Sequence, residues 1–208
     1  ADIKSNDLKI DIQPVRELFS VENINVAGDI SSAAFIIAAA SIVEGSEVII
    51  KNIGLNETRT GIIDVLEAMN GNFEIIDKRV ESGEVVGDLI VRYSDKLIGT
   101  TIDSNLIPRL IDEIPVIAIL ATQANGTTVI KDAKELKVKE SNRIKAVVDN
   151  LKNMGAEIEE LEDGMVIKGK TKLKGANIKT FNDHRIAMAF SVASLISEGK
   201  LNLDNTAC

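Results

Sequence analysis

Polar side chains directly precede an apolar run in the stretch FNDHRIAMAF, residues 181 to 190. Asp183 is of a residue type that caps helices, so we expect His184 and Arg185 in the first helical turn. An arginine there is unfavourable against the helix dipole unless a bound anion compensates its charge. Free backbone N–H groups at the same helix end would hold such an anion. The stretch is therefore typical either of an ordinary capped helix or of an anion-binding site.

Two acidic residues precede a second apolar run in the stretch LIDEIPV. Asp112 and Glu113 stand before the run, and Pro115 falls in the first turn, where proline is tolerated. Asp112 could simply cap the helix. It could also be a carboxylate at the mouth of a cleft, where it accepts a proton from a hydroxyl group. The spacing leaves both interpretations open.

A third stretch, ELKVKESNR (residues 135 to 143), gathers opposite charges at a predicted helix start. Lys137, Lys139 and Arg143 surround Glu140, and Arg143 lies about one turn beyond that acid, within reach of the same space. A capped and solvated helix start is the simpler interpretation of this stretch. The serines of GDISSAAF are likewise typical of helix caps, and the arginine of NETRTG is assigned no chemistry.

The composition and motifs exclude several classes of protein. One histidine and one cysteine cannot build a usual structural zinc site, so no metal is expected. The chain has neither a phosphate-binding glycine loop followed by Lys-Ser/Thr nor a dinucleotide fingerprint. A formal net charge of −8 and scarce aromatic residues argue against a nucleic-acid partner.

The same composition indicates a soluble cytoplasmic protein. Cys208 is the single cysteine, which rules out an internal disulfide and fits a reducing compartment. The longest apolar run, residues 33 to 40, is far shorter than the ~20 residues that span a bilayer. The chain begins with Ala1 and stops in or just after an expected strand, so we expect it to be part of a longer protein.

Internal repeats organise the chain. Three segments share a polar start, an Ala/Ile-rich helix, a glycine and a strand; they begin at GDISSAAF, RLIDEIPV and NDHRIAMA. Aligning Gly45, Gly126 and Gly199, each expected at a helix C-terminus, places Ser31 on Asp112 and on Arg185. The helices are apolar nearly all round, which predicts that protein covers every face. The strands EVIIKNI and TTVIKDA are predicted to be buried.

A second repeat places two amphipathic helices after these strands, each followed by a hairpin. The pattern is a β–α–β–α–β–β unit, present twice in full and a third time in part. Such units predict an α/β fold in which equivalent helices point their N-termini the same way. Each N-terminus carries roughly half a positive charge. We therefore expect Asp112, Lys139, Glu140, Arg143, His184 and Arg185 to meet on one anion-attracting face.

The sequence resembles the enolpyruvyl transferases from about residue 21 to residue 208. The resemblance is carried by GDISSAAFIIAAA, LIDEIPVIAILATQANG, ELKVKESNRI and FNDHRIAMAF, in the family's order and spacing. The Lys-Glu-Ser-x-Arg and Asp-His-Arg segments are most similar to the members that act on shikimate 3-phosphate. The resemblance implies an inside-out α/β barrel domain of β–α–β–α–β–β units. Residues 1–208 would form a single domain, the C-terminal one of two, without the last stretch of the family's chain.

The resemblance also implies a reaction and the residues that perform it. Phosphoenolpyruvate would transfer its enolpyruvyl group to the 5-hydroxyl of shikimate 3-phosphate and release phosphate, with no cofactor, in a monomeric enzyme. Asp112 matches the proton acceptor at that hydroxyl, and Lys139 matches a lysine on the shikimate side. Glu140 matches the acid at the methylene carbon. The residues that hold phosphoenolpyruvate in the family match Arg143, Arg185 and the adjoining His184. Glyphosate occupies the same phosphoenolpyruvate position in this family.

Three other interpretations remain open. A sister transferase that acts on a UDP-linked amino sugar shares the fold and the reaction. The RNA-phosphate cyclases have similar repeats, although the acidic charge counts against them. A non-catalytic anion-binding module with merely structural helix caps is the third. Because the first half of the family's chain is absent, we expect residues 1–208 to be inactive alone and to need the N-terminal domain as a partner.

Overall fold

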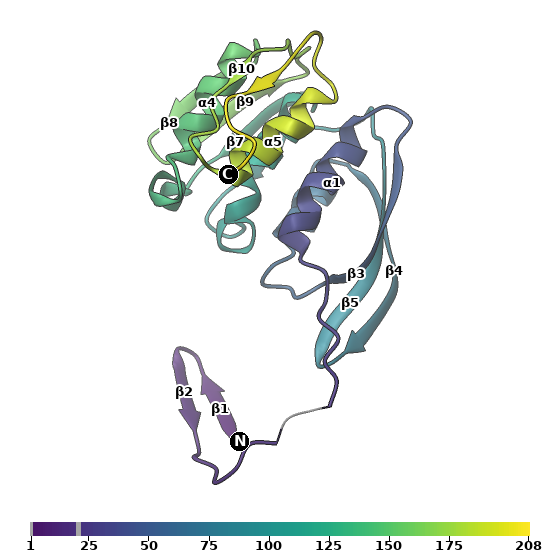
Figure 1. Cartoon of the computed structure of the whole chain (residues 1–208), viewed down its shortest axis with the longest axis vertical. Coiled ribbons are helices and arrows are strands. Elements are labelled where there is room, and N and C mark those ends of the chain that lie inside the picture. Colours follow the sequence, from purple (N-terminus) through teal and green to yellow (C-terminus); the bar gives the residue numbers. More distant parts are fainter. Residues whose placement is uncertain (1, 20–21) are drawn as a thin grey trace.

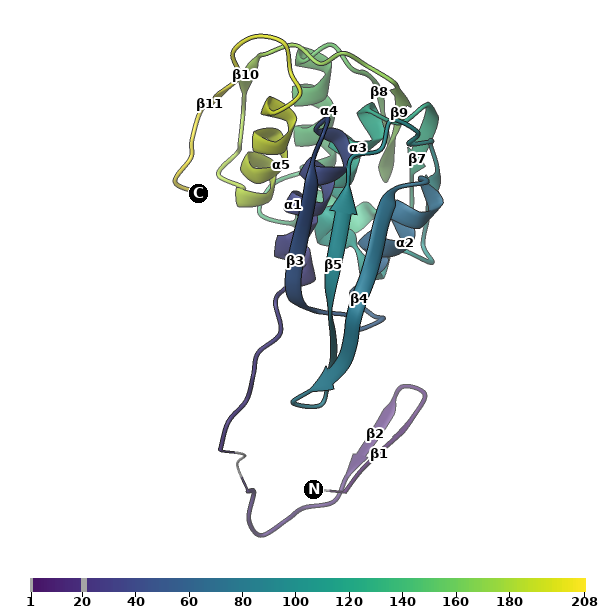
Figure 2. The same ribbon diagram turned by 90° about the vertical axis from the view of Figure 1, so that its right-hand side faces the viewer.

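The computed structural model describes residues 2–19 and 22–208. Three inner helices pack against one another, and the sheets lie outside them (Figures 1 and 2). These helices are α1 (Ile30–Ile42), α3 (Ile114–Thr122) and α5 (His184–Ser194). All nine residues of α3 are buried, which confirms the prediction that protein covers this helix on every face. The prediction is wrong for the other two helices, because Ile36 of α1 is 51% exposed and Met188 of α5 is 39% exposed. Helices inside and sheets outside agree with the predicted fold class.

The first two repeat units are complete. The first contains β3 (Glu47–Gly54), α2 (Gly61–Ala68), β4 (Asn72–Glu81) and β5 (Glu84–Arg92) after α1. The second adds to α3 the elements β6 (Thr101–Ile102), β7 (Gly126–Ile130), α4 (Arg143–Asn153), β8 (Glu157–Leu161) and β9 (Gly164–Gly169). Three short 3-10 helices connect these elements: η1 (Ile107–Arg109), η2 (Ile111–Glu113) and η3 (Lys134–Val138).

Strand pairing shows the same plan in each unit. The sheets have the orders β3-β5-β4 and β6-β7-β9-β8. We call β3 and β7 the central strands, because each lies between a parallel partner and the hairpin. The second hairpin strand, β5 or β9, pairs antiparallel with the central strand, and the first hairpin strand pairs antiparallel with the second. A parallel partner flanks the central strand, as a Gly28–Ile53 bridge in the first unit and as β6 in the second. The third unit has only the parallel pair of β10 (Asn177–Ile178) and β11 (Asn202–Leu203) around α5. The predicted repeat is therefore confirmed, twice in full and once in part.

Two local predictions differ from the structure. Gly45, Gly126 and Gly199 do adopt positive φ angles of 77°, 94° and 91°, where a glycine is favoured. They do not cap their helices, because the helices end earlier. Gly45 and Gly199 lie in the segments that lead into the next strand, and Gly126 is the first residue of β7. The strand β3 is not buried on both faces, since alternate residues such as Ile49 are exposed on the outer side of the sheet.

An N-terminal hairpin stands clear of the main body (Figures 1 and 2). It consists of β1 (Ile3–Asn6) and β2 (Lys9–Ile12), and every residue of both strands is exposed to solvent. Within residues 2–19 and 22–208, the helices are all too short or too polar to cross a membrane.

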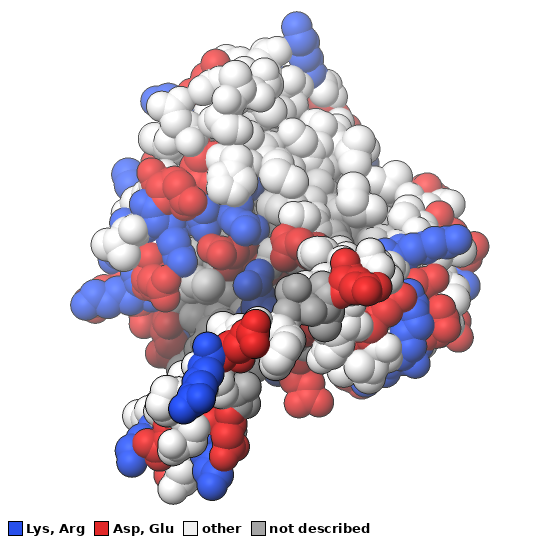
Figure 3. Space-filling view, turned by 60° about the horizontal axis from the view of Figure 1, so that its bottom comes forward, with Lys and Arg blue, Asp and Glu red and all other residues white. Residues whose placement is uncertain are grey.

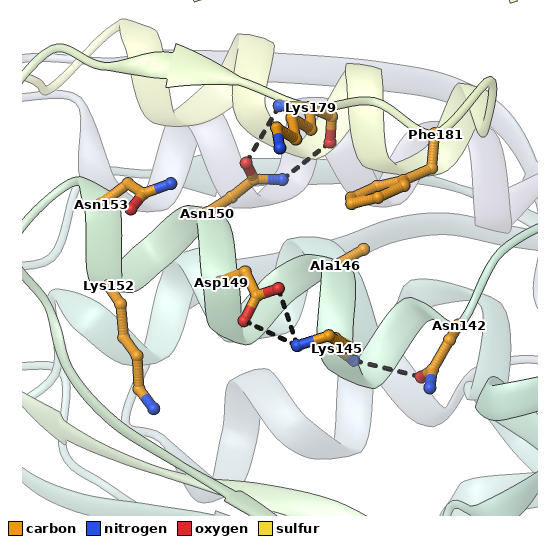
Figure 4. A pocket seen from close by; sticks show the side chains of 9 residues that line it. All are labelled: Asn142, Lys145, Ala146, Asp149, Asn150, Lys152, Asn153, Lys179 and Phe181. Carbon is orange, nitrogen blue, oxygen red and sulfur yellow. Dashed lines mark hydrogen bonds and ion pairs between the residues drawn. The ribbon is translucent and has the colours of Figure 1, made fainter.

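A buried amide fixes the segment that leads into α5. Asn150, on α4, accepts a hydrogen bond from the N–H of Lys179 (3.0 Å) and donates one to its carbonyl (2.9 Å). Figure 4 shows this pair of bonds at the edge of a groove of about 540 Å³, into which Phe181 projects. Because Lys179 lies just before Asp183, the two bonds set the position at which α5 begins.

We expect Asn150→Ala to lower the free energy of unfolding by about 2–4 kcal/mol, because two backbone groups lose their partner. Asn153→Ala is the matched control, since Asn153 is exposed on the same helix and lines the same groove. This control should change stability by no more than about 0.5 kcal/mol. Urea denaturation of both variants measures the difference, and equal midpoints would contradict a role for Asn150 in holding the chain at Lys179.

Candidate active site

The three inner helices begin at the same end of the body, as Figure 1 shows for α1 and α5. Asp29 caps α1 by accepting hydrogen bonds from the N–H groups of Ser31 and Ser32. Asp183 caps α5 by accepting one from the N–H of Arg185 at 3.0 Å. The prediction that equivalent N-termini share a face is confirmed, but each end carries its own acidic residues. The face is therefore not uniformly positive, and Figure 3 shows basic and acidic side chains interleaved on this side.

Arg143, the first residue of α4, lies at the centre of the site. Its side chain is only 1% exposed, and three carboxylates surround the guanidinium. Nε donates to Asp183 Oδ2 at 2.9 Å, Nη1 to Asp112 Oδ1 at 2.9 Å, and Nη2 to Glu140 Oε2 at 2.5 Å. Charge-assisted bonds of this kind are about twice as strong as neutral ones. The guanidinium therefore ties together three segments that are distant in sequence.

Asp112 joins this centre to two further cations. Its carboxylate lies 3.7 Å from Lys139 Nζ and 3.8 Å from Arg185 Nη2, while Arg185 Nη1 also donates to the Asp112 carbonyl at 3.4 Å. Burial would raise the pKa of Asp112, but the charges of Arg185, Lys139 and Arg143 outweigh it and hold the pKa below its ordinary value. Asp112 is therefore an ionised carboxylate surrounded by positive charge.

The structure brings five of the six predicted site residues into one ion-pair cluster, which holds Asp112, Lys139, Glu140, Arg143 and Arg185. His184 is the first residue of α5 and its side chain is exposed beside this cluster, next to Arg185 in the chain. Lys139 also pairs with Glu135 at 2.7 Å, and that contact raises the pKa of the lysine. Lys137, in η3, does not take part in these contacts.

The contacts of Asp112 and Arg143 bear on two expectations about this cluster. Asp112 is not a helix cap, because α3 begins after Glu113 and no side chain accepts a capping bond there. Arg143 is not free to grip a ligand in the structure, because carboxylates already occupy its N–H groups. Its pairing with Glu140 is the most accessible of these contacts, since the Glu140 side chain is 51% exposed.

Asp183 is a member of the cluster that sequence reasoning treated only as a helix cap. The residue is fully buried and accepts hydrogen bonds from Arg143 and from Ser141 Oγ, the latter at 2.9 Å. Burial would raise its pKa, but the bonds from Arg143 and Ser141 outweigh that effect and lower it. The local sequence signals the cap but not the pairing with Arg143, which lies forty residues away in the chain.

Beside the cluster, Asp112 borders a hollow of only about 90 Å³. Glu113 lines the same hollow; burial raises its pKa, and its Oε1 has no hydrogen-bond partner among the described residues. Arg59, which sequence reasoning left without a role, donates to Ser31 Oγ at 2.8 Å across the hollow's rim. Ligand sites usually measure about 300–1,000 Å³, so this wall alone does not enclose a substrate. No group of three or more His, Cys, Asp or Glu side chains suited to a metal occurs in the described part of the chain.

Similar solved structures define the class of proteins that share this fold. The enolpyruvyl transferase NikO from Streptomyces tendae shares the fold, with a TM-score of 0.65 over 86% of this chain at 16% identity. An EPSP synthase structure from Acinetobacter baumannii matches with a TM-score of 0.94 and 39% identity over 99% of this chain and 47% of the other. The fold is therefore that of the enolpyruvyl transferases.

The family model of EPSP synthase (3-phosphoshikimate 1-carboxyvinyltransferase) matches residues 1–208, and the chain belongs to that family. A 3-phosphoshikimate 1-carboxyvinyltransferase of Oceanobacillus iheyensis is 52% identical over all of this chain and 48% of its own length. One from Alkaliphilus oremlandii is 51% identical over 99% of this chain. The match includes the first 20 residues, to which the sequence resemblance did not extend. The chain spans about half the length of these curated relatives.

We expect Asp183→Ala to destabilise the protein by about 3–5 kcal/mol, because it leaves the buried Arg143 without its most enclosed partner. Glu140→Ala removes an exposed partner of the same guanidinium and should cost less than about 1 kcal/mol. Urea unfolding at neutral pH compares the two variants. A cost for Glu140→Ala as large as that for Asp183→Ala would contradict the central place of Asp183.

The dependence of stability on pH should also show the pairing of Asp183 with Arg143. Because the pKa of folded Asp183 is lowered from 3.8, its contribution is complete above that value and is lost as pH falls through the folded pKa. The Asp183→Asn variant lacks this group, so its stability should fall less steeply with acid than that of the unaltered protein. Unfolding measured between neutral and strongly acidic pH tests this, and parallel curves would show that Asp183 titrates normally.

Proposed function

We propose that residues 1–208 belong to a two-domain enzyme that transfers the enolpyruvyl group of phosphoenolpyruvate to the 5-hydroxyl of shikimate 3-phosphate. One observation carries the proposal: paired cations and carboxylates gather at the common end of the inner helices, in a chain of the EPSP synthase family. The names of the relatives favour shikimate 3-phosphate over a UDP-linked amino sugar as acceptor. No cofactor enters the reaction, and the exposed free thiol of Cys208 fits a cytoplasmic location.

The site on this chain forms one wall of a cleft in this proposal. Its hollow is too small for either substrate, and the charged side chains of Lys139 and Arg185 are partly exposed beside Asp112. The other domain supplies the second wall, so that both anionic substrates lie between two sets of charged groups. Such positioning turns two separate reactants into one pre-assembled pair.

Asp112 accepts the proton of the acceptor's 5-hydroxyl in this mechanism. Its lowered pKa makes it a weak base while it lies beside the charges of Arg185 and Lys139. Anionic substrates bound at those two cations would cancel their charge, and the pKa of Asp112 would then rise towards that of a useful base. Lys139 holds the acceptor on the same side. The base therefore becomes effective only once the substrates are in place.

Arg185 and Arg143 hold phosphoenolpyruvate, with His184 beside them. Guanidinium groups suit this task because they can bind carboxylate and phosphate through two parallel hydrogen bonds. Arg185 is the more available, since its contacts with Asp112 are 3.4 Å or longer. Arg143 becomes available when Glu140 leaves it, and Glu140 is the exposed partner.

Once it has left Arg143, Glu140 also takes part in the reaction. The acceptor oxygen bonds to C2 of phosphoenolpyruvate while Glu140 donates a proton to the methylene carbon, which gives a tetrahedral intermediate. Glu140 then takes a proton back from the new methyl group as phosphate departs and the double bond is restored. The departing phosphate takes the hydroxyl proton held by Asp112, so atoms and charges balance. Displacement of Glu140 from Arg143 by the anionic substrate frees this exposed carboxyl group to approach the methylene carbon.

We expect Arg185→Ala in the full-length enzyme to weaken phosphoenolpyruvate binding roughly 10- to 150-fold, because a charge-assisted bond is worth about 1.5–3 kcal/mol. Shikimate 3-phosphate should bind nearly as before. Arg92→Ala is a matched control, since Arg92 forms its ion pair with Glu47 on the outer sheet. Titration calorimetry with each substrate measures the split, and equal losses for both would mean that Arg185 is structural.

Residues 1–208 alone should fold but should not release phosphate from the two substrates. Folding is expected because α3 and its neighbours already form a continuous buried core. Turnover is not expected, because losing half of the substrate grip forfeits about 7–11 kcal/mol of barrier reduction. Phosphate release is measured with this chain alone and after mixing with the separately produced other domain. Recovery on mixing supports the proposal, whereas activity of the chain alone would exclude it.

A further inference from the structure

The N-terminal hairpin has one apolar and one polar face. Its antiparallel register pairs Ile3 with Ile12 and Ser5 with Ile10, and side chains on alternate residues share a face. Three isoleucines therefore lie together on one side. The opposite side carries only polar and charged residues, namely Lys4, Asn6, Lys9 and Asp11. Such a separation of faces is typical of a sheet that packs against an apolar layer.

In the described structure this apolar face is open to solvent. Ile3, Ile10 and Ile12 are 61%, 64% and 61% exposed, and the hairpin stands apart from the body (Figure 1). An isolated two-stranded hairpin is at best marginally stable in water. Strand β2 also offers an unpaired edge, since β1 occupies only its other side. The hairpin thus lacks both a layer over its face and a neighbour at its edge.

The two complete repeat units show what such a hairpin packs against. In each unit the second hairpin strand, β5 or β9, pairs antiparallel with a central strand, β3 or β7. The inward residues of these strands are fully buried, as Leu89 and Val91 are in β5 and Met165 and Ile167 are in β9. Strand β2 has the same place in its hairpin, and Ile10 and Ile12 have the same alternation.

The order of elements along the chain agrees with this comparison. The hairpin β4–β5 precedes the inner helix α3, and the hairpin β8–β9 precedes the inner helix α5. The hairpin β1–β2 likewise precedes the inner helix α1. A hairpin that directly precedes an inner helix forms the last two strands of the repeat unit before that helix. It is not part of the unit that contains the helix. Residues 3–12 therefore have the place of the last two strands of a preceding unit.

We propose that β1–β2 is the closing hairpin of a repeat unit in the other domain of the full-length protein. A central strand of that unit pairs antiparallel with the free edge of β2, and an apolar helix covers Ile3, Ile10 and Ile12. The chain spans about half of its relatives' length, which leaves room for such a unit. The inference uses the two-domain arrangement proposed above but none of the catalytic roles. The boundary between the domains then falls between residue 12 and α1, instead of residues 1–208 forming a single domain.

Hydrogen exchange tests the docking in the full-length protein. The amides of β2 should exchange at least about tenfold more slowly there than in residues 1–208 alone, because packed strands open less often than exposed ones. Equal exchange in both would overturn the proposal. Protection that arises in residues 1–208 alone as their concentration is raised would identify a second copy as the occupant and would also overturn it. Neither readout depends on turnover, so a failure here is distinguishable from a failure of the proposed reaction.

A pair of matched variants separates the two faces. Ile10→Glu should abolish the slow exchange of β2 in the full-length protein, while Lys9→Glu, on the polar face, should leave it within about twofold. In residues 1–208 alone, Ile10→Glu should leave the urea midpoint unchanged, which also guards against a full-length variant that fails to fold. A lowered midpoint in that shorter chain would show that the hairpin packs on its own body, contrary to the proposal.

Discussion

The buried guanidinium of Arg143 is the constraint on which the rest of the site depends. A charge that is 1% exposed cannot be left without partners, because removing it from water costs several kcal/mol. Its partners Asp112 and Asp183 precede the inner helices of two different repeat units. The requirement to pair this one charge therefore fixes how the second and third units meet. The common end of the inner helices is held by an ion pair as well as by apolar packing.

The same interaction leaves the site close to neutral in the structure described here. Three cations face four carboxylates: Lys139, Arg143 and Arg185 against Asp112, Glu135, Glu140 and Asp183. An anionic ligand therefore has to displace a carboxylate or rely on a cation from another domain. An anion that neutralises the cations around Asp112 raises the proton affinity of that carboxylate, since the charges of these cations lower its pKa. In the proposed mechanism, substrate binding and the activation of Asp112 as a base are therefore a single electrostatic event at this cluster.

The fold could be predicted from the sequence where the pattern was local and repeated. Helices apolar on every side, as α3 is, indicate burial without any knowledge of neighbours, and the repeat then fixes the order of the elements. The turns around Gly45, Gly126 and Gly199 were right in conformation but wrong in place, because a positive φ does not say whether a helix has already ended. The outer face of β3 was predicted as buried, since a short aliphatic run looks the same on a one-sided sheet.

The site was predictable in its members but not in its connections. Aligning the repeats brought Asp112 and Arg185 to the same face, and the structure places them 3.8 Å apart. The buried state of Arg143 was not predictable, because its partners lie 31 and 40 residues away. Asp183 was recognised for its capping bond alone, although the same carboxylate also holds the guanidinium. Local spacing shows what a side chain can do for its own helix, and long-range pairing decides what else it does.

The chain also separates what folds by itself from what needs a partner. Helix α3 is enclosed entirely by elements of this chain, so the core around it does not depend on other parts of a longer protein. The apolar face of β1–β2 lacks that enclosure in the described structure, since every residue of both strands is exposed. The charged cluster lies between these extremes, because Asp183 and Arg143 are anchored in the core while Glu140 and His184 face outward. A core that is complete and a periphery that is open allow one domain to hold its cluster in place and leave the opposite wall to be added.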